Sequence, residues 1–339
     1  MKKKLLSTIL CAAMAVTMLA GCSSKANDAA KEETTQEETT QETTKDVSVN
    51  DDAATKETVS TDEKITVGVS LLNNAHVFYN NIEAALVEKA KELNVELIIQ
   101  DAAGDANKQL GQVQDFITQD VDAIILCPTN SAGSKSMVEL ADAAGIPVFT
   151  MDVASDGEVV THVSTDNYKG GQLAAEYMAN KVLKDKAGDV AVITYSEIEG
   201  CVDREKGFTD WMSENAPDVN VVDIQNYSGD QGKAAEVMQN MLLKNENLAA
   251  VFCVGDPAAV GAMSSIDAVG KDVKVIGFDG NPEGIEAILS GGNWVADIAQ
   301  DPASIGSQTL EAVRTYLSGG DVEKLIPISP TVIDATNAK

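Results

Sequence analysis

The chain has 339 residues, of which 44% are hydrophobic and 23% charged, so most of it is able to bury a core. Its formal net charge of −28 argues against nonspecific nucleic-acid binding and against a polybasic grip on anionic lipid, because both need a field of lysine and arginine. With two histidines and five cysteines, a metal cluster built from those residues is not expected either. We also see no run of alternating Asp and Asn followed by Glu, so we expect no calcium loop, and we expect no cofactor.

The first 22 residues have the pattern of an export signal. Lys2, Lys3 and Lys4 form a positive segment, and the apolar segment 5–20 is too short for a comfortable membrane span. Leu19-Ala20-Gly21 before Cys22 resembles the lipobox of bacterial lipoproteins. The resemblance implies cleavage after residue 21, a diacylglyceryl group on Cys22 and a place on the outer face of the cytoplasmic membrane. An ordinary secretory signal with an incidental cysteine is the alternative.

Residues 22–63 have a different composition, with repeated Thr and Glu pairs and almost no large apolar side chain. Residues 23–63 hold twelve acidic and four basic residues, for a net charge of −8. Such a segment cannot bury enough surface to offset its ordering entropy, and like charges extend it. We therefore expect a disordered tether, which suits a Gram-positive surface protein.

The remainder of the chain alternates short apolar runs with stretches of helical periodicity. The expected strands are 65–70, 95–100, 123–127, 147–151, 190–194, 219–224, 249–253 and 273–278. The expected helices lie near 77–93, 107–119, 134–144, 168–185, 204–216, 230–245, 256–269 and 282–290. This alternation predicts an α/β fold with parallel sheets covered on both faces.

Eight such units are compatible with a closed (β/α)8 barrel, but the spacing favours two open sheets. The repeat is broken near 150–167, where a short strand at 160–164 intervenes. Further β-like runs follow at 294–299 and 326–333. In open α/β sheets, ligands bind at the carboxyl ends of the strands.

Polar residues follow several of the expected strands. Ser70, Asn73 and Asn74 come after the first, Asp152 after the fourth, Asp203 and Arg204 after the fifth and its loop. Asp256 and Asp279 follow two later strands, and Gln300 ends the strand at 294–299. Any one of them is explained as a helix cap or a turn residue, but their repeated occurrence at strand ends indicates a binding site.

At this point the chain resembles the ribose-type periplasmic sugar-binding proteins over residues 64 to about 334. The motifs that carry the resemblance are Ile-Thr-Val-Gly-Val-Ser70 with Leu-Asn-Asn74, Val-Ser-Thr-Asp-Asn167 with Gly170-Gly171, Asp203-Arg204-Glu-Lys-Gly-Phe208, Val-Met-Gln-Asn240 and Val-Ile-Gly-Phe-Asp-Gly280.

The resemblance implies two Rossmann-like lobes joined by three crossing segments, which is the type I periplasmic binding protein fold. The crossings are expected near 165–168, 299–302 and 329–331. Residues 64–166 with 301–330 would form the N-terminal lobe, and 167–300 with 331–339 the C-terminal lobe. Ligand would lie in the cleft, and the lobes would close over it by hinge bending. The protein, expected to be a monomer, would deliver its ligand to an ABC importer permease.

The family's binding positions match Asn74, Asp152, Arg204, Asp279 and Gln300, with Ser70 as a weaker contact. These side chains suit a small neutral polyhydroxy ligand, such as a pentose, a hexose or a polyol. A carboxylate accepts hydrogen bonds from neighbouring hydroxyls, an arginine presents a fork of donors, and an amide does both. A site rich in Asp disfavours sugar phosphates.

Three departures from the ribose-type pattern make unmodified ribose recognition doubtful. Val153 stands where the family has Arg, and Gly255 before Asp256 stands where it has Asn. Ala75, His76 and Val77 replace aromatic residues, for which Phe78, Tyr79, Tyr195 and Tyr227 are candidate substitutes. His76 and Asp256 become candidate ligand contacts in turn. Each lost hydrogen bond to a charged group is worth about 1.5–3 kcal/mol.

Two other functions stay open on the sequence. A surface sensor that presents a sugar-like signal such as autoinducer-2 to a membrane receptor would have the same cleft. A carbohydrate-acting enzyme would need two carboxylates that flank a glycosidic bond, and the sequence carries no P-loop, HExxH, GxSxG or strand-linked GxGxxG motif. Binding is therefore favoured over catalysis.

Overall fold

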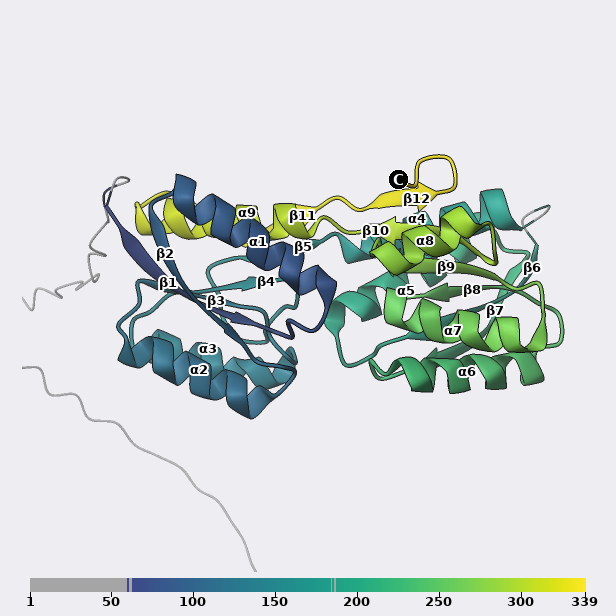
Figure 1. Ribbon diagram of the computed structural model, residues 1–339, viewed down its shortest axis with the longest axis horizontal. Helices are drawn as coiled ribbons and strands as arrows, with labels where there is room; N and C mark the ends of the chain where they lie inside the picture. The colour runs from purple at the N-terminus through teal and green to yellow at the C-terminus, as the bar shows by residue number, and fades with distance from the viewer. Residues whose placement is uncertain (1–59, 61–62, 184, 186) are drawn as a thin grey trace, which may run out of the picture. The chain divides into compact units, whose positions relative to one another are not determined.

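The computed structural model describes residue 60 and residues 63–183, 185 and 187–339 (Figure 1). Cys22, the export signal and nearly all of the expected tether lie outside the described residues. The described chain forms two six-stranded sheets, each with helices on both faces. The expected α/β class with two parallel-sheet lobes is confirmed.

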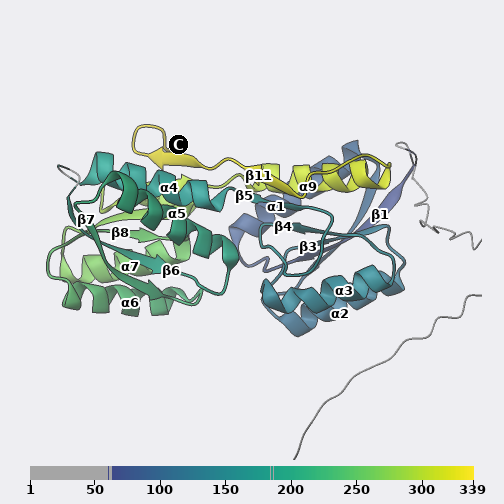
Figure 2. The ribbon, with the colours of Figure 1, turned by 180° about the vertical axis from the view of Figure 1, so that it is seen from behind.

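The first sheet has the strand order β11-β5-β4-β3-β1-β2, and all its neighbours are parallel. Its strands are β1 (Ile65–Leu71), β2 (Val95–Asp101), β3 (Ala123–Leu126), β4 (Val148–Met151), β5 (His162–Thr165) and β11 (Leu325–Ile328). Its helices are α1 (Val77–Glu92), α2 (Ala106–Thr118), α3 (Lys135–Ala143), preceded by the short η1 (Ala132–Ser134), and α9 (Pro302–Leu317). Figure 2 shows α2 and α3 on one face of this sheet and α1 and α9 on the other.

Alternate residues of the central strand β3 explain why the sheet is buried on both faces. Ala123 and Ile125 belong to the core beneath α1 and α9, whereas Ile124 and Leu126 belong to the core beneath α2 and α3. On the neighbouring strand, Gly68 leaves room for the ring of Phe116, which a Cβ at Gly68 would meet at 2.5 Å. Strands covered on both faces read as continuous apolar runs, which is why they could be recognised in the sequence.

The second sheet has the order β12-β10-β9-β8-β6-β7, in which β12 alone of these strands runs antiparallel to its neighbour. Its strands are β6 (Gly188–Thr194), β7 (Val219–Asn226), β8 (Leu248–Cys253), β9 (Lys274–Asp279), β10 (Trp294–Ala299) and β12 (Thr331–Asp334). Its helices are α4 (Asn167–Tyr177), α5 (Glu199–Asn215), α6 (Gln231–Lys244), α7 (Asp256–Val269) and α8 (Pro282–Ser290). A π-helical turn, η2 (Met178–Val182), continues α4.

The chain passes between the two sheets at three places. The first lies between β5 and α4, the second between β10 and α9, and the third between β11 and β12. The β-like run expected at 326–333 is therefore two strands in different sheets, separated at Ser329 and Pro330. Proline has no N–H for a ladder, so the strand breaks there.

Candidate ligand-binding site

A cavity of about 330 Å³ lies at the carboxyl ends of strands from both sheets. The first sheet contributes the loop after β1 and the residues after β4. The second sheet contributes α5 and the ends of β8, β9 and β10. The volume is at the small end of the range for small-molecule sites, so it suits a ligand of monosaccharide size.

Arg204 is the centre of the polar side of this cavity, with 7% of its side chain exposed. Its Nε donates to Asn167 Oδ1 at 2.7 Å, and its Nη1 donates to the carbonyl oxygen of Val254 at 2.7 Å. The guanidinium carbon lies 3.7 Å from the ring centroid of Phe278. The Phe278 ring and the two hydrogen bonds fix the plane of the guanidinium group. Arg204 therefore presents its remaining N–H groups in one orientation.

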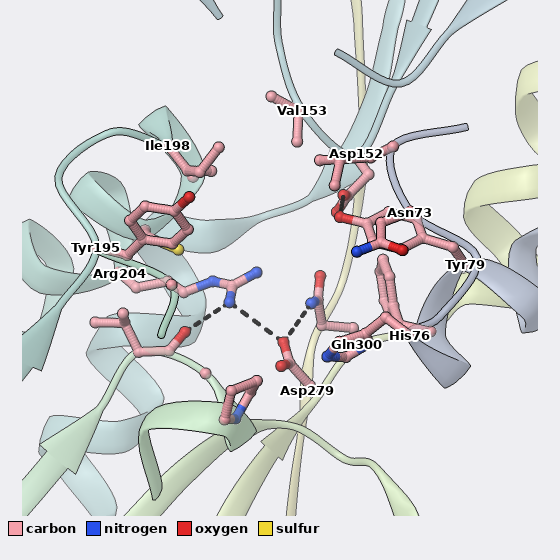
Figure 3. Close-up of a pocket in the computed structure, with 18 of the residues that line it drawn as sticks. Asn73, His76, Tyr79, Asp152, Val153, Tyr195, Ile198, Arg204, Asp279 and Gln300 are labelled. Atoms are coloured by element: carbon pink, nitrogen blue, oxygen red, sulfur yellow. Dashed lines mark hydrogen bonds and ion pairs between the residues drawn. The ribbon is translucent and has the colours of Figure 1, made fainter. Parts of the chain in front are cut away.

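Asp279 and Gln300 complete the polar side (Figure 3). Asp279 Oδ1 accepts from Arg204 Nη1 at 3.3 Å and from Gln300 Nε2 at 2.7 Å. Gln300 Oε1 in turn accepts from the Thr165 hydroxyl at 2.6 Å. Asp279 has a φ of 124°, which is rare outside glycine, so these contacts hold a strained residue in place.

Two glycines place the helix that carries Arg204. Helix α5 packs against α4, and a Cβ at Gly171 would fall against the Arg204 carbonyl and 2.8 Å from Phe208 N. A Cβ at Gly207 would fall against the Tyr168 carbonyl. The helices approach this closely because both positions lack a side chain. Helix α5 begins at Glu199 rather than at the expected residue 204, so Arg204 lies in its second turn.

Asp152 faces the cavity from the first sheet, directly after β4. Its Oδ2 accepts from the Tyr79 hydroxyl at 3.0 Å and from the Cys127 thiol at 3.8 Å. Burial raises the pKa of Asp152 to about 6, although the Arg204 charge and the Tyr79 hydroxyl act in the opposite direction. The carboxyl group therefore titrates near pH 6, above the usual range of an aspartate.

Aromatic and aliphatic side chains form the rest of the wall. Tyr195 and Tyr227 pack edge to face with ring centroids 5.5 Å apart, and Phe78 and Tyr79 do the same at 5.3 Å. Val153 and Ile198 lie on the side of Arg204 away from Asp279 (Figure 3). The cavity thus combines charged and amide groups with aromatic and aliphatic walls, which matches the two kinds of surface on a sugar ring.

The structure brings together Arg204, Asp279, Gln300, Asp152 and His76 of the residues singled out in the sequence. Within the described residues, His76 Nδ1 is buried without a hydrogen-bond partner. All four candidate aromatic substitutes line the cavity as well: Phe78, Tyr79, Tyr195 and Tyr227.

Three other candidates do not line the cavity. The Ser70 hydroxyl is buried against α2, where it donates to Gln112 Oε1 at 2.6 Å. The Asn74 amide turns to Glu83 on α1, at 2.7 Å, and its neighbour Asn73 faces the cavity instead. Asp256 is buried beneath the loop that follows β9.

The sequence does not point to Asn167 or Ile198 as parts of the site. Asn167 belongs to a family motif, and its side-chain oxygen accepts from Arg204 Nε and so orients the guanidinium. Ile198 carries no sequence signal, because an isolated aliphatic residue in a loop looks like any core residue. In the structure it packs against the cores of both sheets.

Comparison with known proteins agrees with this geometry. Residues 67–321 match the family model described as periplasmic binding protein domain. The ribose import binding protein of Bacillus subtilis strain 168 is 35% identical over 271 residues, which is 78% of this chain and 85% of that protein. The chain belongs to the ribose-type periplasmic sugar-binding protein family.

Solved structures give the same fold. The solute-binding protein of an ABC transporter from Actinobacillus succinogenes 130z with bound D-allose superposes with a TM-score of 0.74 at 25% identity, covering 81% of this chain and 99% of that one. A counterpart from Bacillus halodurans C-125 with bound myo-inositol gives 0.73 at 27% identity, covering 81% and 96%. The type I periplasmic binding protein fold is confirmed.

The expectation of a binding protein rather than an enzyme also bears on the site. The relatives are named as binding proteins rather than enzymes, in agreement with a binding role for this chain. In the part of the chain that the structure describes, no helix is long and apolar enough to cross a membrane.

Proposed function

We propose that this family member is an extracytoplasmic, lipid-anchored solute-binding protein that captures a monosaccharide or similar small polyhydroxy compound and delivers it to an ABC importer permease. The observation that carries the proposal is the joint presence of Asp152, Arg204 and Asp279 in one cavity of about 330 Å³. The named ligands of the relatives, ribose, D-allose and myo-inositol, belong to the same chemical class.

The charges of the cavity favour a neutral ligand. Asp152 and Asp279 supply two carboxyl groups, while Arg204 supplies the one guanidinium among the residues that line it. A phosphate group would meet those carboxylates, whereas hydroxyl groups donate to them. Hydrogen bonds to charged partners are stronger than neutral ones, so each hydroxyl that reaches this cluster adds to affinity and selectivity.

A thermal-shift screen of the purified protein tests the proposal. The panel holds D-ribose, D-allose, L-arabinose, D-glucose, glycerol, myo-inositol and autoinducer-2, with ribose 5-phosphate as the anionic control. A ligand at about 100 times its Kd adds roughly 2.7 kcal/mol to the free energy of unfolding. We expect a rise in Tm for at least one neutral compound and none for ribose 5-phosphate. A panel that leaves Tm unchanged, with a well-folded sample, would contradict the proposal.

The role in import needs a test in cells. In a strain without this protein, uptake of the radiolabelled ligand from the screen should fall and return when the wild-type gene is restored. Unchanged uptake, together with tight binding in vitro, would favour the sensor function instead.

The lipid anchor is tested at Cys22, which lies outside the described residues. We expect Cys22→Ser to release the protein into the medium, because a single changed thiol removes the site of lipid attachment. Cys11→Ser, in the apolar segment of the signal, is the matched control and should leave the protein in the membrane fraction. Retention of the Cys22 variant in that fraction would count against lipidation.

A further inference from the structure

Two carboxyl groups lie beneath the binding loop that follows β9, outside the cavity itself. Asp256 is the first residue of α7 and Asp297 lies in β10, and both are 0% exposed. Two buried carboxylates side by side are costly unless a proton or a cation neutralises one of them. Among the described residues, no group of three or more potential ligands could hold a metal ion here.

The oxygens that face each other are Asp256 Oδ1 and Asp297 Oδ2. Within the described residues, neither atom accepts a hydrogen bond of ordinary distance and angle, although the Trp294 indole lies close enough to Asp297 to lower the pKa of that carboxyl group against the effect of burial. Both atoms converge on one point: a Cβ at Gly284 would lie 3.3 Å from Asp256 Oδ1 and 2.9 Å from Asp297 Oδ2. A Cβ added at Gly277 would also meet the same two oxygens. A single proton shared between the two atoms satisfies both.

The other oxygen of each carboxyl group holds the binding loop. Asp297 Oδ1 accepts from the Gly280 N–H at 2.9 Å, and Asp256 Oδ2 accepts from the Asn281 N–H at 2.8 Å. In addition, the Asp256 N–H donates to Asp279 Oδ2 at 3.2 Å. The pair therefore fixes the two residues after Asp279, whose own backbone has the unusual φ of 124°.

We propose that Asp256 and Asp297 are positioning residues that share one proton, and that loss of this proton loosens the loop at Asp279–Asn281 and lowers ligand affinity as the pH rises above neutrality. The effect on affinity rests on the proposed function, since it requires Asp279 to bind the ligand. The effect on the loop does not.

The surroundings of the pair agree with a retained proton. The charged and titratable groups that face it are Asp279 from β9 and the Cys253 thiol from β8, and Arg204 on α5 reaches it through Asp279. Burial raises the pKa of Asp256 and of Asp297, and for Asp256 the charges of Asp297 and then Asp279 add to the rise. For Asp297 the raised pKa is about 7.

Because both pKa values are raised in the folded protein, the pair destabilises the fold as the pH increases. The folded pair binds more protons than the unfolded chain, whose carboxyl groups titrate near pH 4. Its contribution to stability is therefore complete below about pH 4 and is lost as the pH rises through the folded pKa, near neutrality. The two titrations are coupled, so the observed midpoint belongs to the pair rather than to either residue.

The variant Asp297→Asn removes the titratable proton of the pair but keeps the hydrogen-bonding positions of the side chain. The amide of Asn donates to Asp256 Oδ1 without a titratable proton, and its oxygen still accepts from the Gly280 N–H. Asp272→Asn is the matched control, because this carboxyl group of the same lobe is 81% exposed. Asp256→Asn is the reciprocal variant if Asp297→Asn fails to fold.

The experiment measures amide hydrogen exchange of a peptide spanning Gly280 and Asn281, at pH 6 and pH 8.5, in the full chain without ligand. Variants are compared at the same pH, so the intrinsic exchange rate cancels. At pH 8.5 we expect the wild type and Asp272→Asn to exchange at least about tenfold faster than Asp297→Asn. A pH one unit above the pKa of the pair changes the ratio of its deprotonated to its protonated form by this factor. Equal exchange in all three proteins would overturn the proposal.

A second arm measures Kd by calorimetry with D-ribose, D-allose and myo-inositol at the same two pH values. From pH 6 to pH 8.5, the Kd of the wild type should rise, by at most about tenfold per pH unit. The Kd of Asp297→Asn should change less over the same range. A parallel rise in both proteins would overturn the effect on affinity. Absence of binding by every probe would count against the proposed function, while the exchange measurement would still decide whether the shared proton holds the loop.

Discussion

At the scale of single residues, the polar side of the cavity is built from groups that orient one another. Arg204 is fixed by Asn167 and the Val254 carbonyl, and Asp279 is fixed by Arg204, Gln300 and the Asp256 N–H. A ligand therefore meets donors and acceptors that are already placed, so binding costs less ordering entropy. Asp152 differs, because burial raises its pKa to about 6 and its protonation state therefore changes in the mildly acidic range.

We expect the pH dependence of affinity on its acid side to follow Asp152. Protonation removes an acceptor for ligand hydroxyls, so affinity should rise from pH 5 to pH 7. In Tyr79→Phe, the donor that lowers the pKa of Asp152 is lost, and the midpoint should move upward by about one pH unit. Calorimetric Kd values across this range provide the check.

Tyr168→Phe is the matched control for that measurement. The Tyr168 hydroxyl also donates to a carboxylate, Asp210, but on the exposed surface of α4 and α5. The midpoint of the pH dependence of affinity should be the same in Tyr168→Phe and in the wild type. An unmoved midpoint in Tyr79→Phe would show that Asp152 does not control the acid side.

Val153 is a position at which we expect a substitution to change ligand selectivity. It is 3% exposed, belongs to the core of the first sheet and lines the cavity next to Asp152. We expect Val153→Arg to shift preference toward D-ribose, by about tenfold in relative Kd for one added charged hydrogen bond. Val153→Met, which adds length without donors, should not. Unchanged selectivity in competition titrations would contradict the family correspondence at this position.

At the scale of elements, the sequence predicted where the strands end better than where side chains point. Asp152, Asp279 and Gln300 follow strands directly and line the cavity. Ser70 also lies at a strand end, yet it faces α2, because successive side chains of a strand alternate between faces. Tyr79 reaches the site because it lies in the first turn of α1, and a single sequence does not reveal which face of that turn meets the neighbouring loop.

The contact between α4 and α5 gives a prediction at this scale. We expect Gly207→Ala to lower the free energy of unfolding by about 1–3 kcal/mol, because its Cβ would meet the Tyr168 backbone. The shift of α5 should also weaken ligand binding through Arg204. Gly111→Ala in α2 is the control: its Cβ would meet nothing within 4 Å, so helix propensity should raise stability by about 0.5–1 kcal/mol. Urea denaturation of both variants makes the comparison, and an undamaged Gly207 variant would contradict it.

At the scale of the whole molecule, the two sheets are linked by the three crossings and by the cavity that both of them line. The Thr165 hydroxyl donates to Gln300 Oε1 at 2.6 Å, and the Asp166 N–H donates to the Ile328 carbonyl at 2.8 Å, so crossing segments are bonded to each other. Gln300 also bonds Asp279, which links a crossing directly to the site. We infer that ligand binding and the angle between the lobes are coupled there.

Small-angle X-ray scattering tests that coupling. Addition of the ligand should reduce the radius of gyration of the wild type, because the lobes close over it. In Thr165→Val the hydrogen bond to Gln300 is lost, and we expect a smaller reduction at saturating ligand. Ser290→Ala, which removes a hydroxyl at the far end of α8, should behave like the wild type. A radius of gyration that does not change with ligand would contradict hinge closure.

Asp279, with Arg204 and Asp152, is the group that we propose to bind a small neutral polyhydroxy compound. The most direct measurement is calorimetric titration of the wild type and of Asp279→Asn, at pH 7, with each compound that raises Tm in the screen. Asn keeps the shape of Asp279 but loses the charge, so Kd should rise by about tenfold or more, as expected for one hydrogen bond to a charged group. Equal Kd values for the two proteins would contradict a role of Asp279 in ligand binding.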